Sequence, residues 1–170
     1  KSRSFVGYAG SDSTANAIRF QDRSLNFPSY TRSFRLMKNH VVLKSELTGL
    51  FEDDKQKIIQ ALGNGQFYFS IDLIGDPTGF GFFAWQGKQE FVMGQTISRQ
   101  KGPVRFIVDL GRDLVLPHEI LLIRNGEVVE RSNDSKLELE TKTPGAYRVV
   151  VRVIPTLPVP DGKRWFPWIY

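Results

Sequence analysis

The side chains best suited to acid–base or metal chemistry are few in this sequence. The chain of 170 residues has two histidines, His40 and His118, and no cysteine. Neither histidine belongs to a His-x-His or His-Glu-x-x-His spacing, so spacing alone indicates no transition-metal site. A Ser-His-Asp group could be assembled in space, yet no Gly-x-Ser-x-Gly turn singles out a nucleophile. His40 lies in an apolar stretch and His118 follows Pro117 in a turn, and we expect structural roles for both.

Two other polar stretches have structural explanations. Residues 75–79 read Gly-Asp-Pro-Thr-Gly and lack both the lysine and the strand-to-helix setting of a phosphate-binding loop. We expect a turn between strands there. Asp53 and Asp54 could attract a cation, but carboxylates in the first turn of a helix also complement the helix dipole. The structural interpretation is favoured for this pair as well.

Aromatic side chains are the candidates for ligand binding. The rings of Trp85, Trp165 and Trp168, with Tyr147 and Tyr170, could form a platform on which sugar rings stack, because aromatic faces are apolar and broad. A role in the core or between two segments is the alternative, and it is favoured. Clustering of the three tryptophans on one exposed face would support the platform, whereas burial of all three would oppose it.

The charge pattern argues against a polyanion partner. The net charge is +5, but lysines and arginines are scattered among acidic residues, and no run of five like charges occurs. Nucleic-acid binding is therefore not expected, unless the densest basic group forms one patch. That group consists of Lys1, Arg3, Arg19, Arg23, Arg32, Arg35 and Lys38.

The sequence does not indicate a compartment. No apolar stretch approaches the ~20 residues that cross a bilayer as a helix, and the first residues have no signal-peptide pattern. Because the sequence starts at Lys1 rather than at methionine, we expect it to begin inside a longer protein.

Hydrophobic patterning predicts a mainly β fold, and the strands of this fold position the side chains named above. About seven short strands recur at roughly ten-residue spacing after residue 65, which is typical of an immunoglobulin-like β-sandwich. Asn125-Gly126 is the strongest hairpin pattern, since both turn residues must accept positive φ. The strands are expected at 67–74, 80–85, 89–93, 104–110, 119–124, 127–131, 137–140 and 147–154.

The first 64 residues predict a small α/β segment. Residues 5–10 fit a short buried strand, and residues 11–28 are polar and loop-like. Residues 30–43 fit either a helix or a strand, and the sequence does not decide between them.

The clearest helix is expected at 53–62. Asp53 can cap its first turn, with Gln56 as a capping-box partner, and Gly63 and Gly65 should end it. The residues Ile58, Ile59 and Leu62 form one apolar stripe.

Several motifs, in order along the chain, resemble those of the polymerase-and-histidinol-phosphatase (PHP) metal-dependent phosphoesterases. Residues 4–16 resemble the last metal-binding stretch of that family, where a strand ends in Gly-Ser/Asn-Asp-Ala-His and the Asp and His are metal ligands. Residues 54–68 resemble the late helix of the family, which is followed by Ala-Leu-x-x-Gly-x-x-Tyr. The C-terminal β-sandwich of some members is similar in Met93-Gly94, residues 124–129, residues 145–149 and Pro167-Trp168-Ile169.

This resemblance implies a division into two parts and a damaged metal site. Residues 1–64 would be the end of a PHP-like barrel, and residues 65–170 the C-terminal sandwich. Asp12 matches the aspartate ligand of the family, but Thr14 stands at the position of the histidine ligand. A hydroxyl binds transition metals much more weakly than imidazole does, so Asp12 alone should not hold a metal. Asp12 could instead simply cap a turn, which is the favoured interpretation for this chain.

The leading hypothesis is therefore a non-catalytic accessory region that packs on the upstream barrel domain and binds substrate or a partner. No cofactor is expected in this chain, whereas Mn, Fe or Zn could bind in the full-length parent, where the metal would activate water for attack on phosphate. The alternative is a carbohydrate- or protein-binding sandwich that uses exposed Trp and Tyr residues.

Overall fold

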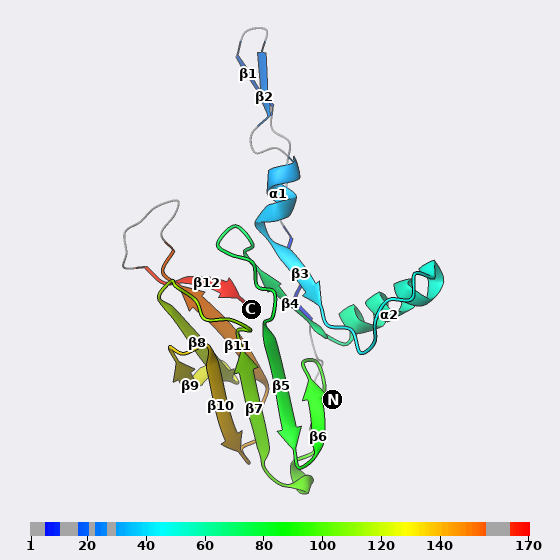
Figure 1. The fold of residues 1–170 in the computed structure, drawn as a ribbon, viewed down its shortest axis with the longest axis vertical. Helices are drawn as coiled ribbons and strands as arrows, with labels where there is room; N and C mark the ends of the chain where they lie inside the picture. Colours follow the sequence, from blue (N-terminus) through cyan, green and yellow to red (C-terminus); the bar gives the residue numbers. More distant parts are fainter. Residues whose placement is uncertain (1–5, 11–16, 21–22, 27–29, 156–163) are drawn as a thin grey trace.

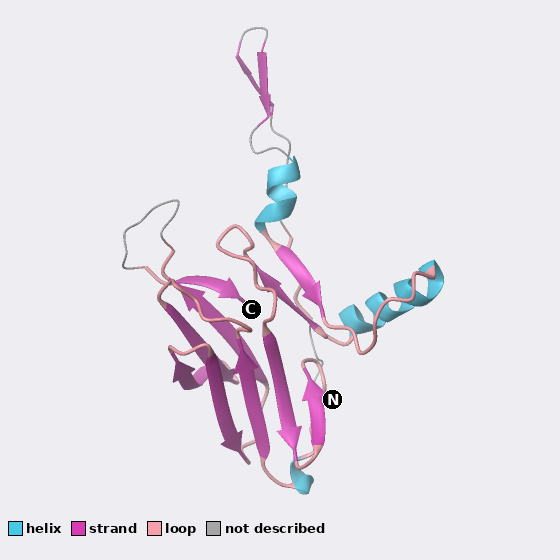
Figure 2. Cartoon of the chain, viewed as in Figure 1, coloured by secondary structure: helices cyan, strands magenta, loops and turns pink. Residues whose placement is uncertain are grey.

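Alternating apolar residues build two antiparallel sheets that face each other (Figures 1 and 2). The computed structural model describes residues 6–10, 17–20, 23–26, 30–155 and 164–170. The prediction of a mainly β sandwich with a small α/β N-terminal segment is confirmed. One sheet has the order β10 (Lys136–Thr141), β7 (Val104–Asp109), β5 (Gly81–Gln86), β6 (Gln89–Val92). The other has the order β3 (Lys38–Val41), β4 (Phe67–Ser70), β12 (Phe166–Ile169), β11 (Tyr147–Val153), β8 (His118–Arg124), β9 (Glu127–Ser132).

The core lies between the sheets and follows the period of two that strands impose. On β7, Phe106 and Val108 point inward, and Leu110 continues the same face just beyond the strand. On β11, Val149, Val151 and Val153 meet the inward residues of β8. A second cluster of Leu121, Ile123 and Val150 lies on the opposite face of the six-stranded sheet and is also buried.

The hairpin predicted at Asn125-Gly126 is present, and a second hairpin joins the strands expected at 80–85 and 89–93. Asn125 and Gly126 join β8 to β9 with φ angles of 51° and 96°, as the sequence required. The Asn125 side chain also accepts a hydrogen bond from the backbone N–H of Ala146 at 2.8 Å, which ties this turn to the start of β11. Gly87, with φ 61°, begins the turn between β5 and β6.

One predicted strand is shorter than its alternation suggested. The run 67–74 forms a strand only to Ser70, because the backbone turns at Ile71 and the N–H of Ile74 donates back to its carbonyl. Leu73, which lies beyond the end of the strand, is 69% exposed.

The first 64 residues differ most from the sequence-based expectation. Residues 6–10 form no strand, and Tyr8 is 58% exposed, so the predicted buried strand is wrong for the described part. Part of the predicted loop 11–28 is a hairpin of β1 (Ala17–Phe20) and β2 (Arg23–Asn26). The ambiguous stretch 30–43 contains both options, a helix and then a strand: α1 (Tyr30–Leu36) followed by β3.

The long helix α2 (Phe51–Gly63) begins two residues earlier than predicted and is not capped by Asp53. Asp54 instead accepts hydrogen bonds from the backbone N–H groups of Thr48 and Gly49, at 2.7 and 2.8 Å, which fixes the turn before the helix. The helix ends at Gly63, and Gly65 follows with φ 69°, as expected.

The segment before the predicted boundary at residue 64 is hydrogen-bonded to the sandwich. Strand β3 pairs along its full length with β4 and is the edge strand of the six-stranded sheet. Figure 1 shows α1 and the β1–β2 hairpin above this edge, and α2 pointing away from the sheets. The short 3₁₀ helix η1 (Arg99–Lys101) leads into β7.

Candidate functional site

A cluster of four polar side chains joins β3 to the end of β4. The His40 Nε2 atom lies 2.8 Å from Ser70 Oγ and 3.3 Å from Asp72 Oδ1. Lys38 Nζ lies 2.6 Å from the other Asp72 oxygen. The imidazole stacks on the ring of Tyr68 with centroids 4.8 Å apart. The residue types are those of a catalytic triad, with a lysine added.

The geometry of this cluster is that of a structural clamp. In a triad the carboxylate and the hydroxyl contact different ring nitrogens, so that one nitrogen is oriented while the other takes the proton. Here both Ser70 and Asp72 contact Nε2, and the Ser70 hydroxyl donates to Asp72 at 2.5 Å. Ser70 is also fully buried, so its oxygen has no access to a substrate.

The charge balance of the clamp depends on Asp72. Burial opposes its ionisation, but hydrogen bonds from Lys38, Ser70 and His40 outweigh that cost and hold the pKa of Asp72 below its usual range. The carboxylate therefore stays charged and links the edge strand β3 to the chain beyond β4. The structural role expected for His40 agrees with this arrangement.

The other histidine also has a local partner. His118 Nδ1 lies 3.0 Å from the carbonyl of Leu116. The described residues contain no group of three or more His, Cys, Asp or Glu side chains that could hold a metal ion. Asp12 and Thr14 lie outside the described residues, and their match to a metal-binding stretch stays a prediction.

The three tryptophans occupy three different settings. Trp85 is half-buried on the outer face of the four-stranded sheet, where its cross-strand neighbours are Glu90 and Arg105. Trp165 precedes β12 on the other sheet and is 36% exposed, with the guanidinium of Arg152 5.0 Å from its ring centroid.

Trp168 belongs to the core rather than to a binding surface. It is 3% exposed, and its indole N–H donates to the carbonyl of Gly75 at 3.1 Å. The burial of Trp168 agrees with the favoured role in the core and removes this ring from the candidate ligand contacts. The three rings do not gather on one exposed face, and only Trp85 and Trp165 remain as predicted contacts for a ligand.

An apolar opening lies between the two sheets where their edges diverge. In Figure 1 β6 stands at the edge of the sandwich, beyond the strands β8 and β11 of the other sheet. The inner faces of β5 and β6 and the loop after β6 form one wall, and the connection from β10 to β11 forms the other. We call this opening the inter-sheet groove. It has a volume of about 570 Å³, and its apolar lining includes Phe82, Phe91, Met93, Ile97, Phe106 and Tyr147.

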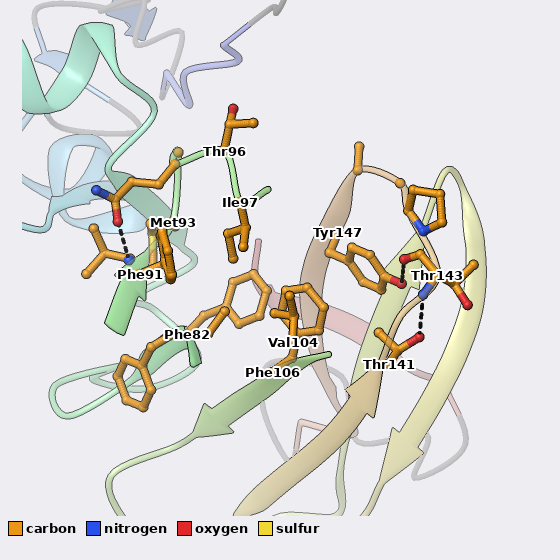
Figure 3. A pocket seen from close by; sticks show the side chains of 18 of the residues that line it. Phe82, Phe91, Met93, Thr96, Ile97, Val104, Phe106, Thr141, Thr143 and Tyr147 are labelled. Carbon is orange, nitrogen blue, oxygen red and sulfur yellow. Dashed lines mark hydrogen bonds between the residues drawn. The ribbon is translucent and has the colours of Figure 1, made fainter. Parts of the chain in front are cut away.

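Figure 3 shows how these side chains converge. Phe82, Phe106 and Ile97 meet in the centre of the groove, with Phe91 and Met93 toward one end and Tyr147 toward the other. The ring of Tyr147 stacks on Phe106 with centroids 4.2 Å apart, and its hydroxyl donates to the carbonyl of Thr143 at 2.7 Å.

Hydrogen bonds hold the loop 93–102, which forms part of one wall. The side chain of Gln95 accepts from the N–H of Val92 at 2.8 Å at the start of the loop. The buried amide of Gln86 donates to the carbonyls of Ser98 and Gly102, at 2.9 and 3.0 Å. Gly94, with φ 80°, lies so close to Asn64 that any Cβ would be 2.0 Å from the Asn64 carbonyl oxygen. The wall is therefore preformed rather than loose.

Sequence reasoning missed the groove because its residues look like ordinary core residues. Tyr147 was singled out, but for a surface platform. The one usable signal was Ile97, an apolar residue in the stretch 94–103 that lies between two predicted strands.

Comparison of the chain with protein-family models, curated proteins and solved structures found no match. Among the described residues, no helix is long and apolar enough to cross a membrane.

Proposed function

We propose that this chain is a non-catalytic accessory region of a PHP-like metal-dependent phosphoesterase. Residues 65–170 act as a β-sandwich that packs on the barrel domain of the same protein, and the segment 1–64 is the end of that barrel. The observation that carries this proposal is the uncovered apolar side of α2 and of the turn before it. Leu47, Leu50, Phe51 and Ile59 are 54%, 64%, 74% and 52% exposed.

The spacing on α2 indicates a face made for packing. At 100° per residue, Phe51, Ile58, Ile59 and Leu62 fall within a stripe about 100° wide, which in a globular protein normally faces a core. The C-terminal end of the helix is covered: the Tyr8 hydroxyl donates to the carbonyl of Leu62, and Ala61 is buried. The N-terminal end of the helix points into solvent, as the projecting helix in Figure 1 illustrates.

The resemblance supplies the identity of the covering layer. It places the helix at the end of a barrel, so the missing layer would be the remainder of that barrel. The Ser70–His40–Asp72 clamp supports the non-catalytic part of the proposal, since its geometry gives no activated nucleophile.

The decisive experiment measures metal content and phosphoesterase activity with Mn, Fe and Zn supplied, on this chain and on the longer parent protein that the proposal requires. We expect metal and hydrolysis in the parent and neither in this chain. Hydrolysis by this chain alone would overturn the proposal. If neither protein is active, the threonine at position 14 has ended the chemistry, and a binding role becomes the better hypothesis.

The packing surface is tested separately with Phe51→Ser and Ile59→Ser in the parent. Each variant should make the junction between the two parts more sensitive to limited proteolysis, because a polar residue weakens an apolar interface. Leu73→Ser is the matched control: Leu73 is 69% exposed but lies on a sandwich turn away from α2. Equal proteolysis of all three variants and the unchanged parent would contradict packing through α2.

A further inference from the structure

We propose that the inter-sheet groove binds the alkyl chain of a free, single-chain fatty acid, with the carboxylate near Lys142. This inference concerns the sandwich alone and does not depend on a parent enzyme or on a metal. It rests on the size of the groove, its chemistry, its rigid walls and its single charge.

The size and lining fit an alkyl chain. A volume of about 570 Å³ lies inside the range of about 300–1,000 Å³ of small-molecule sites. Phe82, Phe91 and Met93 line one part of it, and phenyl rings with an unbranched thioether adapt well to a flexible hydrocarbon. These side chains are only partly buried in this chain although they pack against the core, so a bound chain would remove further apolar surface from water.

The one charged residue of the groove and two of its threonines lie at one end, while Gln95 and Thr96 line the opposite wall. Thr141 ends β10, and Lys142 and Thr143 follow it in the connection to β11. Figure 3 shows Thr141 and Thr143 beside Tyr147. Lys142 is the one charged residue of the lining, and among the described residues its ammonium has no ion-pair partner. A ligand with an apolar tail and one negative charge matches this arrangement, with its head at Lys142 and its tail running past Phe106 toward Met93.

The rigidity of the wall favours a ligand site over a gap left by poor packing. Gln95 and Gln86 fasten the two ends of loop 93–102, and Gly94 is pressed against the backbone at Asn64. A groove that is held open in advance loses little conformational freedom when a ligand enters, which raises affinity. The same hydrogen bonds prevent the loop from collapsing onto Phe82 to close the space.

The test titrates the 170-residue chain with octanoate, decanoate and dodecanoate, below their micelle concentrations, by isothermal titration calorimetry. We expect saturable one-to-one binding whose affinity rises about three- to four-fold for each added methylene until the groove is filled. Dodecyltrimethylammonium, with the same tail and the opposite charge, should bind more weakly than dodecanoate. Absence of saturable binding, or equal affinity for the anionic and cationic amphiphiles, would overturn the proposal.

Two variants locate the site. Ile97→Trp fills the centre of the groove and should lower dodecanoate affinity at least about ten-fold, while Ile59→Trp on α2 should leave it unchanged. Lys142→Met should lower the affinity for dodecanoate about two- to five-fold without affecting dodecyltrimethylammonium. Lys88→Met, in the exposed β5–β6 turn, is its control.

Circular dichroism establishes that each variant is folded before titration. If Ile97→Trp does not fold, Ala146→Trp at the exposed end of the groove replaces it, since Ala146 lies on the surface of the chain. Unchanged dodecanoate affinity in a folded groove-filling variant would show that the fatty acid binds elsewhere and would refute the assignment.

Discussion

The sandwich and the segment before it use the same apolar residue types with different results. In the sandwich, Ile120, Leu122, Val151 and Ile169 are fully buried between two sheets. On α2 and the turn before it, residues of the same kind are more than half exposed. The sandwich contains both of the layers that a core requires, whereas the described part of the first segment contributes only one. The comparison teaches that the sandwich can stabilise itself, while α2 presents a surface that needs a further layer.

The first segment is joined to the sandwich through a small number of specific contacts. The ladder between β3 and β4 is the main one, and the Asp72 clamp reinforces it. Tyr8 also stacks on Phe67 with centroids 4.9 Å apart, and within the first segment Asn39 holds the neighbouring Ala9 by hydrogen bonds to its N–H and carbonyl, at 3.1 and 2.9 Å. These are mostly polar or edge contacts, so they fix position more than they supply burial.

The largest effect should come from truncating equivalent apolar residues in the two regions. Leu122→Ala removes methyl groups from a fully buried site and should lower the free energy of unfolding by about 2–5 kcal/mol. Ile59→Ala, on a residue that is 52% exposed, should change it by no more than about 0.5 kcal/mol. Urea denaturation followed by circular dichroism measures both. A loss of similar size in the two variants would mean that α2 is packed against something within this chain, and the comparison would fail.

The tryptophans offer a second comparison, within the C-terminal strand region itself. Trp168→Phe removes the hydrogen bond to Gly75 and leaves a space in the core, and should cost about 1–3 kcal/mol of unfolding free energy. Trp165→Phe should cost less than about 1 kcal/mol, because Phe keeps an aromatic face for Arg152.

The measurement is again urea denaturation, monitored by circular dichroism so that loss of an indole does not alter the signal. Equal losses in the two variants would show that Trp165 contributes to the core as much as Trp168. Trp165 would then no longer be a candidate for a ligand contact on the surface.

Strand periodicity made most of the sandwich predictable. Alternation over 104–110 and the turn at Asn125-Gly126 are local properties, and they place β7, β8 and β9 within a residue or two of their observed bounds. The sequence-based predictions were wrong where tertiary contacts override the local pattern. The run 67–74 alternates well, but the Asp72 side chain bonds back to Ser70 and His40, and the strand ends.

The groove and the clamp were beyond prediction for the same reason. Each is made by residues distant in the sequence, such as Phe82 with Tyr147 or His40 with Asp72, and no local pattern states which strands become neighbours. The sequence left two roles open for Trp168, because an aromatic cluster near the end of a chain is compatible with either core or surface. Only the position of β12 between β4 and β11 decides that it is buried.

The smallest predicted effect concerns the Asp72 clamp, the polar link between the two regions. Asp72→Asn removes a charge-assisted hydrogen bond to Lys38 and weakens those to Ser70 and His40, and should lower the free energy of unfolding by about 1–2 kcal/mol at pH 7. Asp113→Asn, on the exposed loop after β7, is the matched control and should be nearly neutral.

The stability difference caused by Asp72→Asn should depend on pH, which simple loss of packing would not produce. Because the pKa of Asp72 is lowered by folding, its contribution is complete above the ordinary value of 3.8 and disappears as the pH falls below it. The stability difference between the wild-type chain and Asp72→Asn should therefore shrink as the pH falls from about 5 toward 3. The wild-type chain also becomes less stable over that range through Asp54, Asp76 and Asp109, whose pKa values are lowered too, so the comparison must be made between variants. A difference that persists unchanged at pH 3 would mean that shape rather than charge joins β3 to the sandwich.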